Sequence, residues 1–385
     1  MSTVKAITGG ESAAEAMRQI NPDVVAAYPI TPQTIIMQKF ADFHADGLVD
    51  SELTRVESEH SAMSCSVGAS AAGARVVTAT ASAGLALMWE ILGVASGLRL
   101  PILMQVVNRA LSAPINIHCD HSDSMGARDL GWIQIYSENA QEVYENNFLA
   151  MRLAEKVLLP AMVCQDGFIT SHGVENVKIF DDEKIRKFLG EHDYPHSLLE
   201  IEKPTTHGPL QLQDYYFETR SQQIPAMEDA KKQFLAIGKE LSEITGNRYP
   251  FFDQYNMKDA EAVIVVLNST AGTTKTAIDN LRKEGKKVGL LKLRLFRPFP
   301  YKEIAKALQG IKKIAVLDRS VSFGANPPLY GEIKNALYDI KYDGELHSAV
   351  FGLGGRNIYV KDIEDTINRL LSGKLKDHDT IGLRK

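Results

Sequence analysis

Apolar runs without polar interruptions alternate with longer amphipathic segments over the first part of the chain, to about residue 170. The runs predict four buried strands, at Val24–Ala27, Val76–Ala79, Ile102–Val107 and Ala161–Cys164. The segments around them predict helices, at Glu11–Gln19, Thr34–Phe43, Glu59–Ala74, Leu85–Leu98 and Glu142–Lys156. Buried strands that alternate with helices are typical of a parallel sheet covered on both faces. We therefore expect a doubly wound α/β domain.

This alternation stops from about Ile179 to Tyr255, where His, Pro, Gln, Asp and Tyr are frequent and one amphipathic helix is predicted at roughly Glu228–Thr245. We interpret the segment as a linker carrying surface helices and assign it no chemistry. A second alternation then begins, with strands predicted at Val263–Leu267, Val288–Leu293 and Ile314–Leu317. The chain is accordingly expected to form three parts: an α/β domain over 1–178, the linker over 179–258 and a smaller α/β domain over 259–385.

Composition narrows the class of protein without identifying it. The 385 residues are 44% hydrophobic and 24% charged, as in ordinary globular chains, and the net charge of −5 disfavours a nucleic-acid surface. The three cysteines are too far apart for a CxxC-type metal or cluster motif, and they fit a reducing cytoplasm. No signal peptide is visible, and charged residues, glycine and proline interrupt the longest apolar stretch, Ala83–Val107. We expect a cytoplasmic protein without a membrane span.

The first candidate for function is the loop Tyr28-Pro29-Ile30-Thr31-Pro32-Gln33, which follows the first predicted strand. Its two prolines fix their own φ angles and favour extended predecessors, so we expect the loop to be stiff. Loops at the carboxyl ends of parallel strands are where α/β sheets bind ligands. The loop would therefore hold the Thr31 hydroxyl in a fixed position. Alternatively, it is an ordinary strand-to-helix turn with Thr31 as the N-cap and Pro32 as the first helical residue.

A carboxylate is the second candidate. Glu59 lies in the segment Arg55–Ser61 (RVESEHS), at the predicted start of a helix and near the positive end of its dipole. Small residues dominate the rest of this helix, which predicts close packing on several sides and an enclosed helix start. An enclosed carboxylate needs a partner or a task. The alternative is that Ser58 or Glu59 only caps the helix.

Three further segments carry polar side chains after predicted strands. The small residues of Thr78–Leu85 (TATASAGL) would let a backbone approach a flat ligand closely. Arg109 follows the strand Ile102–Val107 and suits a bidentate clamp on a carboxylate or phosphate, with a surface ion pair as the alternative. The segment Ser112–Arg128 has no recognised metal-ligand spacing, and we interpret it as a polar loop with helix capping, although it contains His118, Asp120, His121 and Asp123.

Together and in this order, these segments resemble the alpha subunits of pyruvate:ferredoxin oxidoreductases, in the 2-oxoacid:ferredoxin oxidoreductase family. The matching segments are Tyr28–Pro32, Val56–Ala62, Thr78–Ser82, Asn108–Asn116 and, in the second α/β domain, Lys292–Pro300 and Val316–Arg319. The resemblance covers nearly the whole chain. It implies a thiamine diphosphate-binding domain of the pyrimidine-binding type, followed by a domain similar to the carboxyl-terminal domain of transketolases.

The resemblance also implies roles for individual residues. Glu59 occupies the position of the glutamate that hydrogen-bonds N1′ of the cofactor's aminopyrimidine, Thr31 that of a substrate-contacting threonine, and Arg109 that of an arginine facing the substrate carboxylate. The remaining residues expected to line the cofactor are Pro29, Ile30 and Ser82. The implied reaction is the coenzyme A-dependent oxidative decarboxylation of pyruvate to acetyl-CoA and CO2, with electrons passed to ferredoxin.

The chain has neither the Gly-Asp-Gly motif that holds the cofactor's Mg²⁺ nor a cysteine cluster. The resemblance implies that a beta subunit binds diphosphate and Mg²⁺, and that gamma and delta subunits contribute [4Fe–4S] clusters. Three alternatives stay open: a branched-chain, aryl or other 2-oxoacid as substrate, a non-catalytic assembly subunit, or a transketolase-like transferase, which the missing motif disfavours. Two positions depart from many relatives, because Ala83 stands in place of glutamine and Trp89 in place of histidine.

Overall fold

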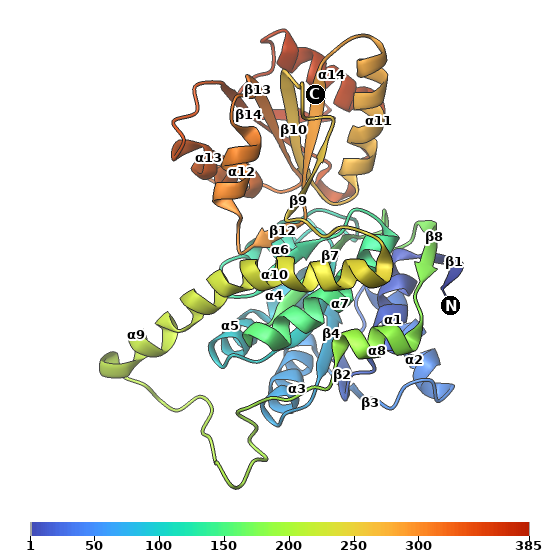
Figure 1. Cartoon of the computed structure of the whole chain (residues 1–385), viewed down its shortest axis with the longest axis vertical. Helices are drawn as coiled ribbons and strands as arrows, with labels where there is room; N and C mark the ends of the chain where they lie inside the picture. The colour runs from blue at the N-terminus through green and yellow to red at the C-terminus, as the bar shows by residue number, and fades with distance from the viewer. Residues whose placement is uncertain (1, 385) are drawn as a thin grey trace.

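The computed structural model describes residues 2–384, which form two α/β lobes, one above the other in Figure 1. The first lobe contains β1 (Thr3–Thr8), α1 (Gly9–Ile20), β2 (Val24–Ala27), α2 (Thr34–Ala45), β3 (Glu52–Arg55), α3 (Glu59–Ala71), β4 (Val76–Thr80), α4 (Ser82–Leu87), α5 (Trp89–Gly97), β5 (Ile102–Asn108), α6 (Ser122–Gly126), β6 (Ile133–Tyr136), α7 (Ala140–Val157), β7 (Ala161–Asp166) and β8 (Val174–Ile179). No helix among the described residues is long and apolar enough to cross a membrane.

The second lobe follows a helical segment of α8 (Asp182–Leu189), α9 (Gln213–Ser221) and α10 (Gln223–Thr245). It contains β9 (Phe252–Tyr255), β10 (Ala262–Leu267), α11 (Thr270–Lys283), β11 (Val288–Leu293), β12 (Leu295–Arg297), α12 (Tyr301–Leu308), β13 (Lys313–Asp318), α13 (Pro328–Tyr338), β14 (Glu345–Phe351), the 3₁₀ turn η1 (Leu353–Gly355), α14 (Val360–Leu371) and β15 (Asp379–Ile381). Its six-stranded sheet has the order β15-β14-β13-β10-β11-β9, in which only β9 is antiparallel to its neighbour.

The larger sheet has seven strands in the order β12-β6-β7-β5-β4-β2-β3. Its strands from β6 to β3 are parallel, and helices cover both faces, as the uninterrupted apolar runs predict. The predicted doubly wound domain with a smaller α/β domain after it is confirmed. All four strands predicted for the first domain are present, three of them longer at the carboxyl end than predicted.

Two segments join the first lobe from farther along the chain. One face of α10 is buried in the core that α1 and α7 form, through Ala230, Phe234, Ile237 and Leu241. β12 pairs antiparallel with β6, so the segment after β11 leaves the second lobe to add an edge strand to the first sheet. Residues of the predicted linker and of the predicted second domain thus pack on the first lobe. The predicted division of the chain at 178 and 258 therefore remains a prediction.

One expectation about helices is wrong, and another holds only in part. The predicted helix Leu85–Leu98 is two helices, α4 and α5, which meet at Met88. The small residues of α3 pack against neighbouring elements on one side, where Ala62 and Ser66 are buried, whereas Ser64 and Gly68 are exposed and a Cβ at Gly68 would meet nothing within 4 Å. Small side chains permit close packing without supplying a neighbour, so the sequence pattern could not decide this.

Candidate active site

The carboxyl ends of β2, β4 and β5 bring three of the predicted segments to one edge of the larger sheet. These strands are adjacent and parallel in the order β5-β4-β2, so the loops that follow them must lie close together. They are Tyr28–Gln33 after β2, Ala81–Ser82 after β4 and Arg109–His121 after β5. The start of α3, which packs on β2 and β4, lies beside them.

Glu59 is the first residue of α3 and is 7% exposed, so the predicted enclosure of the helix start is confirmed. The Ser58 hydroxyl caps the helix by accepting a hydrogen bond from the Ser61 backbone N–H at 3.2 Å. The capping role therefore falls to Ser58, and the Glu59 carboxylate accepts no hydrogen bond from within the described residues. Because a buried carboxylate without a donor is costly, its partner is expected to come from another molecule.

The Glu59 and Thr80 side chains pack directly against the backbone of Gly84. A Cβ on Gly84 would lie 2.7 Å from Glu59 Oε1 and 2.6 Å from Thr80 Oγ1. The Thr80 hydroxyl is itself buried and has no hydrogen-bond partner. Two polar groups without a hydrogen-bond partner among the described residues thus lie against one glycine, and an alanine at that position would displace both of them.

Arg109 is 8% exposed and is held by two backbone carbonyls. Its Nε donates to the Asn116 carbonyl oxygen and its Nη1 to the Thr31 carbonyl oxygen, both at 2.8 Å. The alternative of a surface ion pair is wrong, because no carboxylate among the described residues contacts this guanidinium. Arg109 therefore reaches the loop after β2 and keeps further N–H groups for an anionic ligand.

The loop after β2 is not a simple helix cap. α2 begins at Thr34, with Gln33 as its N-cap and with no side-chain capping bond, so the alternative that makes Thr31 the N-cap is wrong. Thr31 and Pro29 are exposed, whereas Ile30 is half-buried, and its backbone N–H donates to Gln33 Oε1 at 3.3 Å. The structure thus brings Thr31 beside Arg109 and leaves its side chain on the open side of the loop.

Ser82 is buried and has a positive φ angle of 48°, which is unusual for a residue other than glycine. Its hydroxyl donates to the Ala110 carbonyl oxygen at 2.5 Å, and its backbone N–H donates to Asp123 Oδ2 at 3.0 Å. Ser82 therefore connects the loop after β4 to the loop after β5. Its hydroxyl is engaged within the chain, so a cofactor contact by Ser82 remains a prediction.

Asp123 is the residue that sequence reasoning did not single out. It lies in the short helix α6 and is 3% exposed. Burial raises its pKa to about 6, although hydrogen bonds from Asn108, Arg109 and Ser82 oppose that rise. The sequence predicts a polar loop with helix capping here, and the segment is a loop that leads into α6, but the N-cap residue His121 makes no side-chain capping hydrogen bond. The sequence around Asp123 gives no sign of these hydrogen bonds, because its partners are distant in sequence: Ser82 lies 41 residues away and Arg109 lies 14 residues away.

A buried hydrogen-bonded cluster around Asp166 joins the two lobes. Its carboxylate contacts His121 Nε2 at 2.8 Å and accepts from Asn268 Nδ2 at 3.0 Å and Arg319 Nη1 at 3.3 Å. Burial would raise the pKa of Asp166, but the charges of Arg319 and His121 outweigh it and lower that pKa strongly. Cys119, His121 and Asp166 place ligand-type atoms within 4.8 Å of one another. The guanidinium in direct contact fits an ion-paired junction rather than a cation site.

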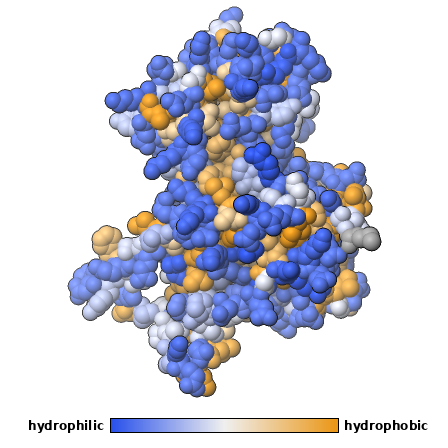
Figure 2. Space-filling model, viewed as in Figure 1, coloured by the Kyte–Doolittle hydropathy of each residue, from blue (hydrophilic) through white to orange (hydrophobic). Residues whose placement is uncertain are grey.

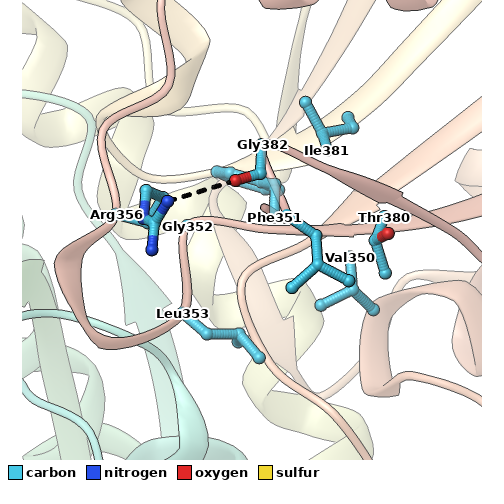
Figure 3. Close-up of a pocket in the computed structure, with 9 residues that line it drawn as sticks. Val350, Phe351, Gly352, Leu353, Arg356, Thr380, Ile381 and Gly382 are labelled. Atoms are coloured by element: carbon cyan, nitrogen blue, oxygen red, sulfur yellow. Dashed lines mark hydrogen bonds between the residues drawn. The ribbon is translucent and has the colours of Figure 1, made fainter. Parts of the chain in front are cut away.

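A glycine-rich turn of the second lobe supports the loop that holds Arg109. Asn116 Nδ2 donates to the Gly354 carbonyl oxygen at 3.0 Å, and the Gly355 N–H donates to the Cys119 carbonyl oxygen at 2.6 Å. The same turn borders a hollow of about 410 Å³ at the carboxyl end of the smaller sheet, where Arg356 Nη1 donates to the Gly382 carbonyl oxygen (Figure 3). None of the predicted site residues lines that hollow.

Comparison with protein families gives two matches along the chain. The family described as "Pyruvate flavodoxin/ferredoxin oxidoreductase, thiamine diP-bdg" matches residues 15–239, and "Pyruvate:ferredoxin oxidoreductase core domain II" matches residues 260–363. Both matches agree with the resemblance found from the sequence motifs.

Curated relatives match over almost the full chain. Pyruvate synthase subunit PorA of Thermotoga maritima is 55% identical over 99% of this chain and 98% of its own length. The subunit of the same name from Methanocaldococcus jannaschii is 48% identical over 100% of this chain and 99% of its own. Ketoisovalerate oxidoreductase subunit VorA of Pyrococcus horikoshii is 44% identical over 96% of this chain and 95% of its own length.

Two solved structures show the same fold. A 2-oxoglutarate:ferredoxin oxidoreductase from Magnetococcus marinus, with 2-oxoglutarate, coenzyme A and succinyl-CoA bound, superposes with a TM-score of 0.75 at 19% identity. The match covers 96% of this chain and 65% of that one. A split-gene transketolase, described as an inactive beta4 tetramer, superposes with a TM-score of 0.57 at 11% identity and covers 96% of this chain and 100% of that one.

Proposed function

The chain belongs to the pyruvate:ferredoxin oxidoreductase family, as an alpha-type subunit, and on this premise we propose that it catalyses the oxidative decarboxylation of pyruvate within a heteromeric complex. Pyruvate and coenzyme A would be converted to acetyl-CoA and CO2, with two electrons passed to ferredoxin. The observation that carries the proposal is the buried Glu59 carboxylate, which has no hydrogen-bond donor within the described residues and packs against Gly84 together with the unpartnered Thr80 hydroxyl.

The residues around Glu59 fit the aminopyrimidine of thiamine diphosphate. Glu59 offers a buried carboxylate and Thr80 a buried hydroxyl without a partner, and Gly84 lets both side chains pack against its backbone. Thiamine diphosphate, when bound, supplies the nucleophilic carbon and the electron sink that decarboxylation of a 2-oxoacid requires. Glu59 would hold a proton shared between its carboxylate and a ring nitrogen, and Pro29, Ile30 and Ser82 would complete the walls.

Substrate recognition is assigned to Arg109 and Thr31. The Arg109 N–H groups that the backbone carbonyls leave free would bind the carboxylate of the 2-oxoacid. The Thr31 hydroxyl, on the loop that Arg109 holds, would contact the substrate next to that carboxylate. This assignment fixes the head of the substrate, which all 2-oxoacids share, and leaves the side chain of the substrate to other walls.

The remaining functions fall to other chains of the proposed complex. A beta subunit would bind the diphosphate and Mg²⁺, because this sequence contains no Gly-Asp-Gly motif. Gamma and delta subunits would carry [4Fe–4S] clusters toward ferredoxin. Robust 2-oxoacid oxidation by this chain expressed alone would contradict the division of labour.

Glu59→Gln in the assembled complex tests the proposal directly. Removing the carboxylate while keeping its volume should lower kcat by about a hundredfold or more, since proton transfer by a positioned group contributes that much. Glu57→Gln is the matched control, because Glu57 is exposed two residues earlier and its carboxylate accepts a hydrogen bond from the Ser61 hydroxyl. The measurement is coenzyme A-dependent viologen reduction with pyruvate. Full activity of Glu59→Gln would favour an assembly role for this chain.

A branched-chain 2-oxoacid is the second candidate substrate. It is favoured by the 44% identity to the ketoisovalerate oxidoreductase subunit, which is close to the 42–48% found for several pyruvate synthase subunits. A screen of pyruvate, 2-oxobutyrate, 2-oxoisovalerate and aryl 2-oxoacids in the same assay separates the two candidates by kcat/KM. A preference for 2-oxoisovalerate would replace pyruvate without changing the roles of Glu59 and Arg109.

A further inference from the structure

Asp123 lies where the loops after β4 and β5 meet, and no step of the proposed function uses it. Its Oδ2 accepts hydrogen bonds from the backbone N–H groups of Ser82 and Arg109, each at 3.0 Å. Its Oδ1 accepts from Asn108 Nδ2 at 2.9 Å and from the Ser124 N–H at 2.7 Å. One carboxylate thus receives four donors from three different segments.

The pattern requires a carboxylate. All four neighbours donate, and only an ionised carboxylate accepts at both of its atoms. The side chain is buried, so water does not replace a lost acceptor there. An asparagine would keep one accepting oxygen and present an N–H₂ group to the remaining donors, whereas an alanine would leave all four without an acceptor.

The two backbone groups bound at Oδ2 belong to residues next to the proposed chemistry. Ser82 is two residues from Thr80 and two from Gly84, the residues beside Glu59. Arg109 is the proposed ligand of the substrate carboxylate. Asp123 therefore sets the distance between the part of the site assigned to the aminopyrimidine and the part assigned to the 2-oxoacid head.

We propose that Asp123 is a positioning residue that holds the Ser82 turn and Arg109 at the spacing the reaction needs. This inference rests on the proposed function of Glu59 and Arg109. Without the bridge, the Ser82 hydroxyl still donates to the Ala110 carbonyl oxygen, but the Arg109 backbone N–H loses its acceptor. Arg109 is then held less firmly relative to the Ser82 turn, and the substrate carboxylate is bound less tightly. Loss of the bridge should therefore raise the KM for the 2-oxoacid more than it lowers kcat.

The test compares Asp123→Ala and Asp123→Asn in the assembled complex. We expect Asp123→Ala to raise the KM on the order of tenfold or more, since unsatisfied buried donors cost at least one factor of ten in binding. Asp123→Asn restores one acceptor and should fall between Asp123→Ala and the wild type. Both should lower kcat/KM for pyruvate and 2-oxobutyrate by the same factor, because the bridge acts on the shared head of the substrate.

Asp129→Ala is the control, since Asp129 is an exposed carboxylate six residues farther along the chain. Gel filtration establishes assembly of each complex before kinetics. If Asp123→Ala does not assemble, Asp123→Asn decides: a raised KM supports the proposal. A KM within twofold of wild type, or unequal effects on the two substrates, overturns it. A wild-type complex that oxidises no 2-oxoacid would instead refute the function proposed for Glu59 and Arg109.

Discussion

At Gly84 the absence of a side chain lets the Glu59 carboxylate and the Thr80 hydroxyl pack against the backbone. The backbone there is helical, so alanine would be accepted by the φ angle and even favoured by helix propensity. The obstacle is purely steric, since the added Cβ would lie under 3 Å from both the Glu59 carboxylate and the Thr80 hydroxyl. The chemistry assigned to Glu59 thus depends on a neighbour that itself has no functional group.

We therefore predict that Gly84→Ala lowers kcat/KM for the 2-oxoacid by tenfold or more while the complex still assembles. The methyl group would overlap the Glu59 and Thr80 side chains, and it therefore displaces the carboxylate that should bind the cofactor ring. The thiamine diphosphate concentration needed for half-maximal activity should rise as well. Steady-state assays at several cofactor concentrations measure both effects.

Gly93→Ala provides the matched control for that substitution. Gly93 is also a helical glycine, in α5, but a Cβ there would meet nothing within 4 Å. Its activity should equal that of the wild type, and its stability should rise by about 1 kcal/mol at most. Equal activity of Gly84→Ala and Gly93→Ala would mean that the reaction does not depend on the position of the Glu59 carboxylate.

Among the elements, the turn η1 of the second lobe acts on the first lobe through one loop. Gly354 has a φ angle of +59°, and its carbonyl oxygen accepts from Asn116, whose own carbonyl oxygen accepts from Arg109. A Cβ on Gly354 would lie 2.4 Å from Asn116 Nδ2. The position of Arg109 therefore depends on an element nearly 240 residues away in sequence.

Gly354→Ala is predicted to raise the KM for the 2-oxoacid several-fold, because it pushes Asn116 away from the turn and loosens Arg109. Gly310→Ala separates this effect from backbone strain, since Gly310 also has a positive φ angle, of +82°, but open space around it. Both variants should lose about 1 kcal/mol of stability. Only Gly354→Ala should change the KM, and an equal KM in both variants would disprove the link.

Elements built from local patterns could be predicted from the sequence. Strands β2, β4, β5 and β7 are continuous apolar runs, and the motif residues Thr31, Glu59 and Arg109 follow strands or open a helix, where chemistry is expected. The pairing of β12 with β6 could not be predicted, because a three-residue strand beside Pro298 has no periodicity of its own. The Asp123 bridge could not be predicted either, since it depends on the order of strands in the sheet.

Exposed apolar residues occur on the segment that connects the two lobes along the chain. The long loop after α8 and helix α9 extend away from the body in Figure 1, and none of the residues of α9 is buried. Apolar residues appear on this projecting part in Figure 2, and its exposed members include Leu199, Leu210, Tyr215 and Phe217. Exposed apolar residues gathered in this way are typical of interaction surfaces, which agrees with a subunit of a larger complex.

A charged network connects α7 of the first lobe with the second lobe. Glu142 accepts hydrogen bonds from Lys292 and from Arg294 Nη2, and Asp253 lies 2.7 Å from Lys292 and 3.1 Å from Arg294. The Lys292 and Arg294 side chains are 2% and 4% exposed. Because both cations are buried, removing one of their anions leaves charge that water cannot solvate.

Burial alone would raise the pKa of Glu142, but the charges of Arg294 and Lys292 outweigh it and lower the pKa to about 2. A carboxylate with a lowered folded-state pKa contributes stability that is fully present above its unfolded pKa, about 4.5. The contribution is lost as the pH falls from that value through about 2. The difference between the two pKa values corresponds to about 3 kcal/mol at neutral pH.

We predict that Glu142→Gln lowers the free energy of unfolding by about 3 kcal/mol at pH 7 and by clearly less at pH 3, where wild-type Glu142 has lost part of its advantage. Glu240→Gln is the control, because Glu240 pairs with Arg152 at the surface and should contribute about 1 kcal/mol at most. Urea unfolding at the two pH values measures both variants. A loss that does not depend on pH would show that Glu142 stabilises the junction by packing instead of charge.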